Sequence, residues 1–193
     1  IVLCLVTIKV SAIEKVILFG DSLMAGYGLP KKQHLSVVLQ KSLEIDGYNI
    51  EIVNGSVAGS TSAGGLNIAE WTLAESNVDL MILCLGANDM LRGISPKETK
   101  NNLEEIIKIA KSENIKVIIA GMIAPTSYGI EYKKSFDKIF FDLSKKYKLQ
   151  LIPFLLEGVA QKPQFNLSDG MHPNDQGTII IGNTLKKAIL ENL

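Results

Sequence analysis

The 193-residue sequence has few cysteines, few histidines and no excess of charge of either sign. It contains two cysteines and two histidines, and its 20 basic residues balance 20 acidic ones. Cys4 lies in an apolar stretch near the start and Cys84 in an apolar run typical of a core, so no disulfide framework is expected. Two histidines without a cysteine pair offer no metal-ligand cluster. Zero net charge gives no electrostatic reason to bind nucleic acid or an anionic membrane. We therefore expect a small-molecule ligand, and no metal, other cofactor or nucleic-acid partner.

The first twelve residues are apolar but too few to cross a bilayer. They read IVLCLVTIKVSA and end in Val10-Ser11-Ala12, which resembles the apolar core and small-residue cleavage site of a secretory signal peptide. Because no initiator Met and no basic segment precede them, we interpret residues 1–12 as the remnant of such a signal. This predicts a periplasmic or secreted protein without a stable membrane anchor. We also expect a monomer in which residues 13–193 form one domain. The alternative is an ordinary first strand in a cytoplasmic protein.

Short apolar runs of strand length recur along the chain and alternate with helical patterns. The runs are residues 15–20, 50–55, 79–86, 115–122 and 149–154, and their nearly continuous hydrophobicity is typical of strands covered on both faces. In residues 95–114, Ser95-Pro96 is a helix start signal, and Leu103, Ile106 and Ala110 form one apolar face. Residues 131–147 and 175–193 are also predicted to be helical. This alternation predicts an α/β fold with a parallel sheet between helices.

Polar segments follow each predicted strand, where open parallel sheets bind their ligands. They are Asp21-Ser22 and the segments NGSVAGSTSAGG, GANDMLRG, APTSYG and LSDGMHPND, which begin at residues 54, 86, 124 and 167. A nucleophilic serine needs a base, a group that orients the base, and donors for the oxyanion. His172 follows Asp169 by three residues, so one turn could join them. His34 has no nearby carboxylate and is expected at a helix edge.

Each of these segments also has a simpler interpretation. Ser22 or Asn88 could cap a helix, Gly59 could permit a tight turn, and Asp169 could belong to a turn without any chemistry. A phosphate-binding module could use the same sheet. However, the sequence has no Gly-x-Gly-x-x-Gly motif and no P-loop, and the NGSVAGSTSAGG segment contains no Lys or Arg. The simpler interpretations do not explain why four such segments fall at one predicted edge.

The segments together resemble the SGNH, or GDSL, hydrolase family. GDSL at 20–23, the glycine-rich segment with Gly59, LGANDMLRG at 85–93 and DGMHP at 169–173 match its sequence blocks in order and spacing. Within the family, the chain is most similar to the bacterial arylesterase, thioesterase and lysophospholipase branch. The resemblance implies a flavodoxin-like three-layer α/β/α sandwich with a five-stranded parallel sheet, the SGNH hydrolase fold.

The resemblance also implies the roles of individual residues. Ser22 would be the nucleophile, His172 the base and Asp169 the group that orients it, while Ser22, Gly59 and Asn88 would hold the oxyanion. The implied reaction is hydrolysis of aryl, acyl and lysophospholipid esters, and of acyl thioesters, through an acyl-enzyme. The alternative is a carbohydrate acetyl esterase of the same family. Four further residues are expected to border the acyl chain: Leu23, Met90, Leu91 and Pro125.

Overall fold

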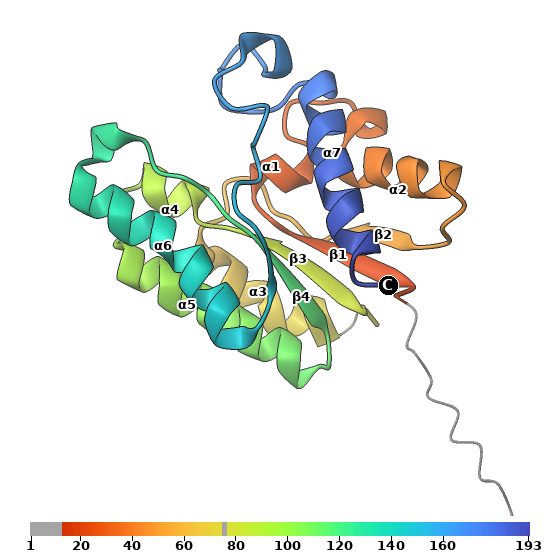
Figure 1. Ribbon diagram of the computed structural model, residues 1–193, viewed down its shortest axis with the longest axis horizontal. Coiled ribbons are helices and arrows are strands. Elements are labelled where there is room, and N and C mark those ends of the chain that lie inside the picture. Colours follow the sequence, from red (N-terminus) through yellow and green to blue (C-terminus); the bar gives the residue numbers. More distant parts are fainter. Residues whose placement is uncertain (1–12, 75–76) are drawn as a thin grey trace, which may run out of the picture.

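A five-stranded parallel sheet lies at the centre of the computed structural model, which describes residues 13–74 and 77–193 (Figure 1). The strands are β1 (Lys15–Gly20), β2 (Glu51–Asn54), β3 (Leu80–Cys84), β4 (Lys116–Ala120) and β5 (Gln150–Ile152), in the spatial order β2-β1-β3-β4-β5. Every neighbouring pair is parallel. The predicted sheet is therefore confirmed. Residues 1–12 lie outside the described residues, so the signal peptide stays a prediction.

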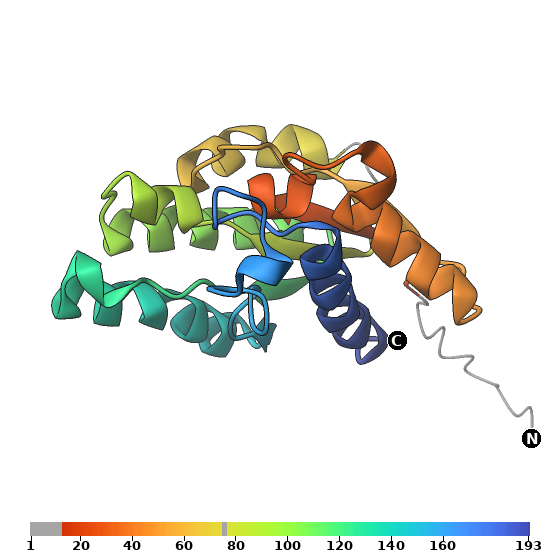
Figure 2. The ribbon, with the colours of Figure 1, turned by 90° about the horizontal axis from the view of Figure 1, so that it is seen from above.

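Helices cover both faces of the sheet (Figure 2). They are α1 (Ser22–Ala25), α2 (Leu35–Ile45), α3 (Ser62–Ala74), α4 (Ala87–Leu91), α5 (Pro96–Ser112), α6 (Ile130–Tyr147) and α7 (Asp175–Leu190). Helix α2 packs against α7 on one face, and α3, α5 and α6 pack side by side on the other. This is the three-layer α/β/α sandwich. Across the described ranges, no helix has both the length and the apolar character needed to span a membrane.

The two central strands β1 and β3 form the middle of the core. Residues 16–20 and 80–84 are buried, including Cys84, whose thiol pKa is raised by burial. In the register of the sheet, Gly20 pairs with Cys84 at the carboxyl ends of these strands. The segments that follow both strands therefore start side by side.

The helix predicted from residue 95 begins as its sequence indicates. Ser95 is the N-cap, its side-chain oxygen accepts from the Glu98 N–H at 3.2 Å, and Pro96 is the first helical residue. Leu103, Ile106 and Ala110 are buried, as the pattern predicts. The three-residue 3₁₀ helices Lys31–Gln33, Thr126–Tyr128 and Pro163–Phe165 lie in the connections.

Candidate active site

Ser22 stands at the carboxyl edge of the sheet because a tight turn follows β1. Asp21 is the N-cap of the four-residue helix α1, and its Oδ1 accepts from the Leu23 N–H at 3.0 Å. Gly26, with φ of +85°, ends the helix in the left-handed conformation that favours glycine. Asp21 thus performs the capping that the sequence allowed for Ser22, and Ser22 itself becomes the first helical residue, partly exposed to solvent.

Ser22, His172 and Asp169 form one hydrogen-bonded series. His172 Nε2 lies 2.9 Å from Ser22 Oγ, and His172 Nδ1 lies 2.7 Å from Asp169 Oδ2. A carboxylate can only accept hydrogen bonds, so Nδ1 carries the proton and the Nε2 lone pair faces the serine hydroxyl. The structure therefore brings together three residues that the sequence predicted as one site.

The loop that carries Asp169 is held by its own backbone. Asp169 Oδ1 accepts from the N–H groups of Met171 at 2.8 Å and His172 at 3.0 Å. These bonds and the His172 side chain lower the pKa of Asp169 to about 2, so it is ionised at neutral pH. The Leu167 N–H donates to the His172 carbonyl at 2.8 Å, which closes the loop. Asp169 thus holds the His172 ring at Nδ1, and backbone hydrogen bonds hold the loop that carries both residues.

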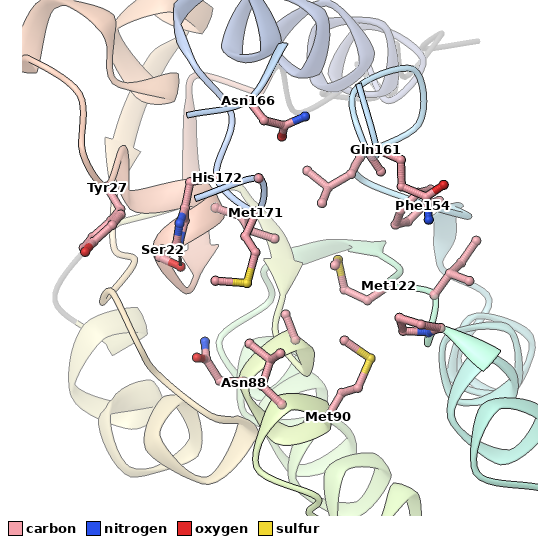
Figure 3. A pocket seen from close by; sticks show the side chains of 18 of the residues that line it. Ser22, Tyr27, Asn88, Met90, Met122, Phe154, Gln161, Asn166, Met171 and His172 are labelled. Carbon is pink, nitrogen blue, oxygen red and sulfur yellow. Dashed lines mark hydrogen bonds between the residues drawn. The ribbon is translucent and has the colours of Figure 1, made fainter. Parts of the chain in front are cut away.

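Tyr27 packs against the His172 ring, a contact that sequence reasoning missed. The two ring centroids are 4.5 Å apart and the planes are tilted by 38° (Figure 3). Tyr27 lies between Gly26 and Gly28, which both have positive φ, and a Cβ on Gly28 would come within 2.6 Å of the Leu167 side chain. The glycines on both sides of this aromatic residue, close to Ser22 in sequence, were the one feature of the sequence that could have indicated a role for Tyr27. His34 is far from this role: it precedes α2 and its Nε2 bonds to the Leu29 carbonyl at 3.0 Å.

Asn88 and Gly59 line the same pocket as Ser22. Asn88 Nδ2 donates to Asp21 Oδ2 at 3.2 Å and to the Ser60 carbonyl at 3.1 Å. Gly59 has φ of +77°, its carbonyl accepts from Arg92 at 2.9 Å, and no hydrogen bond within the described part of the chain uses its N–H. A Cβ on Gly59 would meet no protein atom within 4 Å, so its backbone conformation is what requires glycine here.

A buried carboxylate, Asp89, fixes the helix that carries Asn88. Asp89 accepts from both the N–H and the hydroxyl of Ser62, and from the Thr99 hydroxyl at 3.2 Å. Asn102 adds a bond to the Ser62 hydroxyl at 3.0 Å. These contacts join α3, α4 and α5, because each contributes at least one partner. Asp89 was not predicted as part of the site, and its partners are too distant in sequence to show a local pattern.

Asp21 is buried beside the nucleophile. Its residue exposure is only 1%, and this burial raises its pKa from 3.8 to about 6, although bonds from the Leu23 N–H and the Asn88 amide act in the opposite direction. Because the ionised form is disfavoured in the folded protein, stability depends on pH. The folded state binds more protons than the unfolded state between the two pKa values, so the free energy of unfolding falls as pH rises through this window.

Asp21→Asn is expected to abolish that part of the pH dependence. Relative to the variant, the wild-type protein should lose about 2 kcal/mol of unfolding free energy between about pH 4 and pH 7. Asparagine is an equally good N-cap, so the cap is retained. Urea unfolding of both proteins across this range measures the difference, in which the titrations that both share cancel. Parallel profiles for the two proteins would contradict the assignment.

An apolar pocket of about 510 Å³ opens beside Ser22 (Figure 3). The four predicted substrate-binding residues, Leu23, Met90, Leu91 and Pro125, all line it. Met122 and Ile123, in the loop that was also expected to border the acyl chain, line the pocket as well. Sequence reasoning did not single out the remaining apolar residues of the lining, which include Tyr27, Phe154, Leu156, Ala160 and Met171. Met122 follows β4 and Phe154 follows β5, and both lie across the pocket from Ser22 (Figure 3). Contact of the four predicted residues with a substrate stays a prediction.

A serine, a histidine and an aspartate in hydrogen-bonded series beside an apolar pocket define a serine hydrolase. A family model described as the GDSL-like lipase/acylhydrolase family matches residues 18–178. The chain belongs to this family, and it is an enzyme of the SGNH hydrolase type.

Known proteins of this kind are similar over nearly the whole chain. An arylesterase of Vibrio mimicus is 34% identical over 182 residues, which cover 94% of this chain and 91% of the relative. Thioesterase 1/protease 1/lysophospholipase L1 of Escherichia coli strain K12 is 30% identical over 187 residues, covering 97% of this chain and 88% of that one. The crystal structure of TesA matches with a TM-score of 0.88 and 33% identity, covering 93% of this chain and all of that chain. The predicted family and fold are therefore confirmed.

Proposed function

We propose that the protein hydrolyses carboxylic esters of apolar acyl or aryl groups, including lysophospholipids, together with acyl thioesters. The observation that carries this proposal is the series from Asp169 through His172 to Ser22, with Ser22 Oγ at the wall of an apolar pocket. An ester bound there places its carbonyl next to a hydroxyl whose proton has an acceptor 2.9 Å away. This is the geometry that nucleophilic acyl transfer requires.

The reaction proceeds in two halves through an acyl-enzyme. Ser22 Oγ attacks the carbonyl carbon while His172 Nε2 takes the hydroxyl proton, and the ionised Asp169 stabilises the imidazolium that forms. The tetrahedral intermediate then collapses: the bond to the alcohol or thiol breaks, and His172 returns the proton to that leaving group. In the second half, His172 removes a proton from water, which attacks the acyl carbon. The bond from the acyl carbon to Ser22 Oγ then breaks, His172 returns the proton to Oγ, and the acid leaves. No redox step or cofactor is needed.

The proposed donors to the oxyanion of the tetrahedral intermediate are the Ser22 N–H, the Gly59 N–H and the Asn88 amide. The Ser22 N–H begins a helix, where the first N–H groups have no partner within the helix. Gly59 and Asn88 line the same pocket as Ser22. Both N–H groups of the Asn88 amide donate, to Asp21 and to Ser60, so a bond to the oxyanion would replace one of these two bonds. One donor of this kind is worth about 3 kcal/mol of transition-state stabilisation.

The pocket chemistry favours acyl esters over acetylated sugars. Apolar side chains dominate its lining, with three methionines, Met90, Met122 and Met171, among them. Methionine is flexible and adapts to apolar groups of different shape, whereas a sugar presents hydroxyls that need several polar partners. The names of the relatives, an arylesterase and a thioesterase/lysophospholipase, support the same substrate class.

The test is a comparison of an aryl ester, an acyl-CoA, a lysophospholipid and an acetylated sugar under identical conditions. We expect kcat/KM for the first three to exceed that for the acetylated sugar by at least about tenfold, since apolar burial favours a longer acyl chain. Rapid mixing with an activated aryl ester should also release a burst of phenol and add the acyl mass to Ser22. A preference for the acetylated sugar would favour the carbohydrate acetyl esterase, and the absence of all hydrolysis would overturn the proposal.

We also propose that the protein acts as a monomer, without a stable membrane anchor, outside the cytoplasm. Every residue assigned above to the active site belongs to one chain, which supports the monomer, and the apolar residues 1–12 support export. Sedimentation of the purified protein tests whether it is a monomer. Fractionation of the producing cells tests whether it lies outside the cytoplasm and whether it is attached to a membrane.

A further inference from the structure

Asn166 is a buried amide in the wall of the active-site pocket, on the loop that leads to Asp169 and His172. Its exposure is 8%. Its Nδ2 donates to the carbonyls of Val159 and Lys162, both at 2.8 Å. Because two carbonyls can be satisfied only by the NH₂ end of the amide, these bonds fix which way the side chain faces. The other end of the amide, Oδ1, must therefore point away from both carbonyls.

The Oδ1 atom of Asn166 faces the pocket in Figure 3, and no hydrogen bond formed between described residues reaches it. Among the described residues, no buried side-chain polar atom lacks a partner, so this oxygen is open to the pocket, where water or a ligand can donate to it. In the lining, Met122, Phe154 and Met171 are apolar, and the amide of Gln161 forms no hydrogen bond with Asn166. The acceptor is held in place before any ligand binds.

We infer that Asn166 Oδ1 is a subsite for a hydrogen-bond donor, a hydroxyl or amide N–H, carried by the substrate. The inference rests on the proposed function, since it concerns esters bound beside Ser22. Adding a hydroxyl to a chain in an apolar pocket normally weakens binding, because the hydroxyl loses its bonds to water. At the position that meets Asn166, the new hydrogen bond offsets this loss. The enzyme therefore favours esters that carry a donor at the position that meets Asn166.

The donor can belong to either part of the ester, and a substrate scan distinguishes the two sources. One set consists of ethyl hexanoates in which a single hydroxyl is moved stepwise along the acyl chain, because alkyl esters close to lactones far more slowly than nitrophenyl esters. The other set consists of hexanoates of simple alcohols and of the matching diols. Each kcat/KM is divided by the rate of hydroxide-catalysed hydrolysis, which removes differences in chemical reactivity. We expect one position, in one set, to exceed its hydroxylated neighbours by about tenfold.

The variant Asn166→Leu should remove this exception, so that the ratio of kcat/KM for the favoured ester to kcat/KM for the plain hexanoate falls to that of its hydroxylated neighbours. The ratio of two substrates on one preparation is independent of how much of the variant has folded, so partial unfolding does not disturb it. Gln164→Leu is the matched control, because it removes an exposed amide from the neighbouring 3₁₀ helix outside the pocket lining. This control should keep the wild-type ratio.

Two results would overturn the subsite: a scan of the wild-type enzyme in which no position stands out, or an exception that survives Asn166→Leu. The wild-type scan decides even if the variant fails to fold. If the plain esters are hydrolysed and no hydroxyl position is favoured, only the subsite is wrong. If no ester in either set is hydrolysed, the proposed function itself is wrong.

Discussion

Ser22→Ala is expected to lower kcat/KM for an aryl ester by at least about 10⁴-fold. The change removes the only atom that can form the acyl-enzyme in the proposed mechanism, while His172 and Asp169 keep their own hydrogen bond. What remains is the contribution of the oxyanion donors and of substrate binding, which can still favour direct attack by water. Steady-state hydrolysis of a nitrophenyl ester measures the loss, and mass spectrometry should show no acyl group on the variant.

Ser168→Ala provides the matched control for this substitution. Ser168 is an exposed serine next to Asp169 and does not line the pocket, so the same loss of one hydroxyl should leave kcat/KM unchanged. The Ser22 hydroxyl contributes little to the fold, because the Asp21 side chain and not that of Ser22 caps α1. Circular dichroism and the midpoint of thermal unfolding should therefore match the wild type. Near-normal turnover by Ser22→Ala would disprove the nucleophile assignment.

Local sequence patterns were sufficient to predict the strands and the three long helices from residue 95 onward. Strand β1 covers the predicted residues 15–20, because its residues after Lys15 are all buried between two helical layers. The other strands are shorter than their apolar runs. The run at 79–86, for example, ends as a strand at Cys84, since Leu85 is buried by packing without remaining in the sheet ladder. The hydrophobicity of a segment indicates that it is buried, whereas the residues at which a strand begins and ends depend on hydrogen bonds to the neighbouring strands.

Helix α3 shows what a local pattern could not reveal. The glycine-rich segment from residue 54 suggested a loop throughout, yet the helix begins at Ser62 and includes Gly64 and Gly65. Asp89, 27 residues further along, binds the Ser62 N–H at 2.7 Å and so satisfies the start of the helix from outside. Gly65 is required by packing, because a Cβ there would lie 2.3 Å from the Leu85 side chain. Both causes are tertiary.

The site was predictable to the extent that its motifs occur in sequence. The GDSL and DGMHP motifs identified Ser22, Asp169 and His172, whose hydrogen bonds then follow from the parallel sheet and its loops. Tyr27 was missed because it packs against His172, which is distant in sequence. Asn166 was missed because its interest lies in the direction of its Oδ1 atom, which hydrogen bonds of its NH₂ group determine. Such directions depend on hydrogen bonds that only the folded chain shows.

Asp169→Asn is expected to lower kcat by about 10⁴-fold while leaving KM and the fold nearly unchanged. The amide oxygen can still accept from the Met171 and His172 N–H groups, so the loop is retained. Its NH₂ group, however, replaces the oxygen that lies 2.7 Å from His172 Nδ1, and it donates where the carboxylate accepted. The imidazole then carries its proton on Nε2 and cannot take the proton of Ser22. Steady-state kinetics with a nitrophenyl ester measure the loss.

Asp175→Asn separates this tautomer effect from a general loss of negative charge. Asp175 is exposed at the start of α7, three residues beyond His172, and its substitution removes the same charge without a contact to the imidazole. We expect this variant to keep the wild-type kcat. Equal losses in both variants would mean that the loop needs net charge and not an acceptor at Nδ1. A loss confined to Asp169→Asn, with an unchanged KM, means that the carboxylate acts on the transition state by holding one proton on one nitrogen.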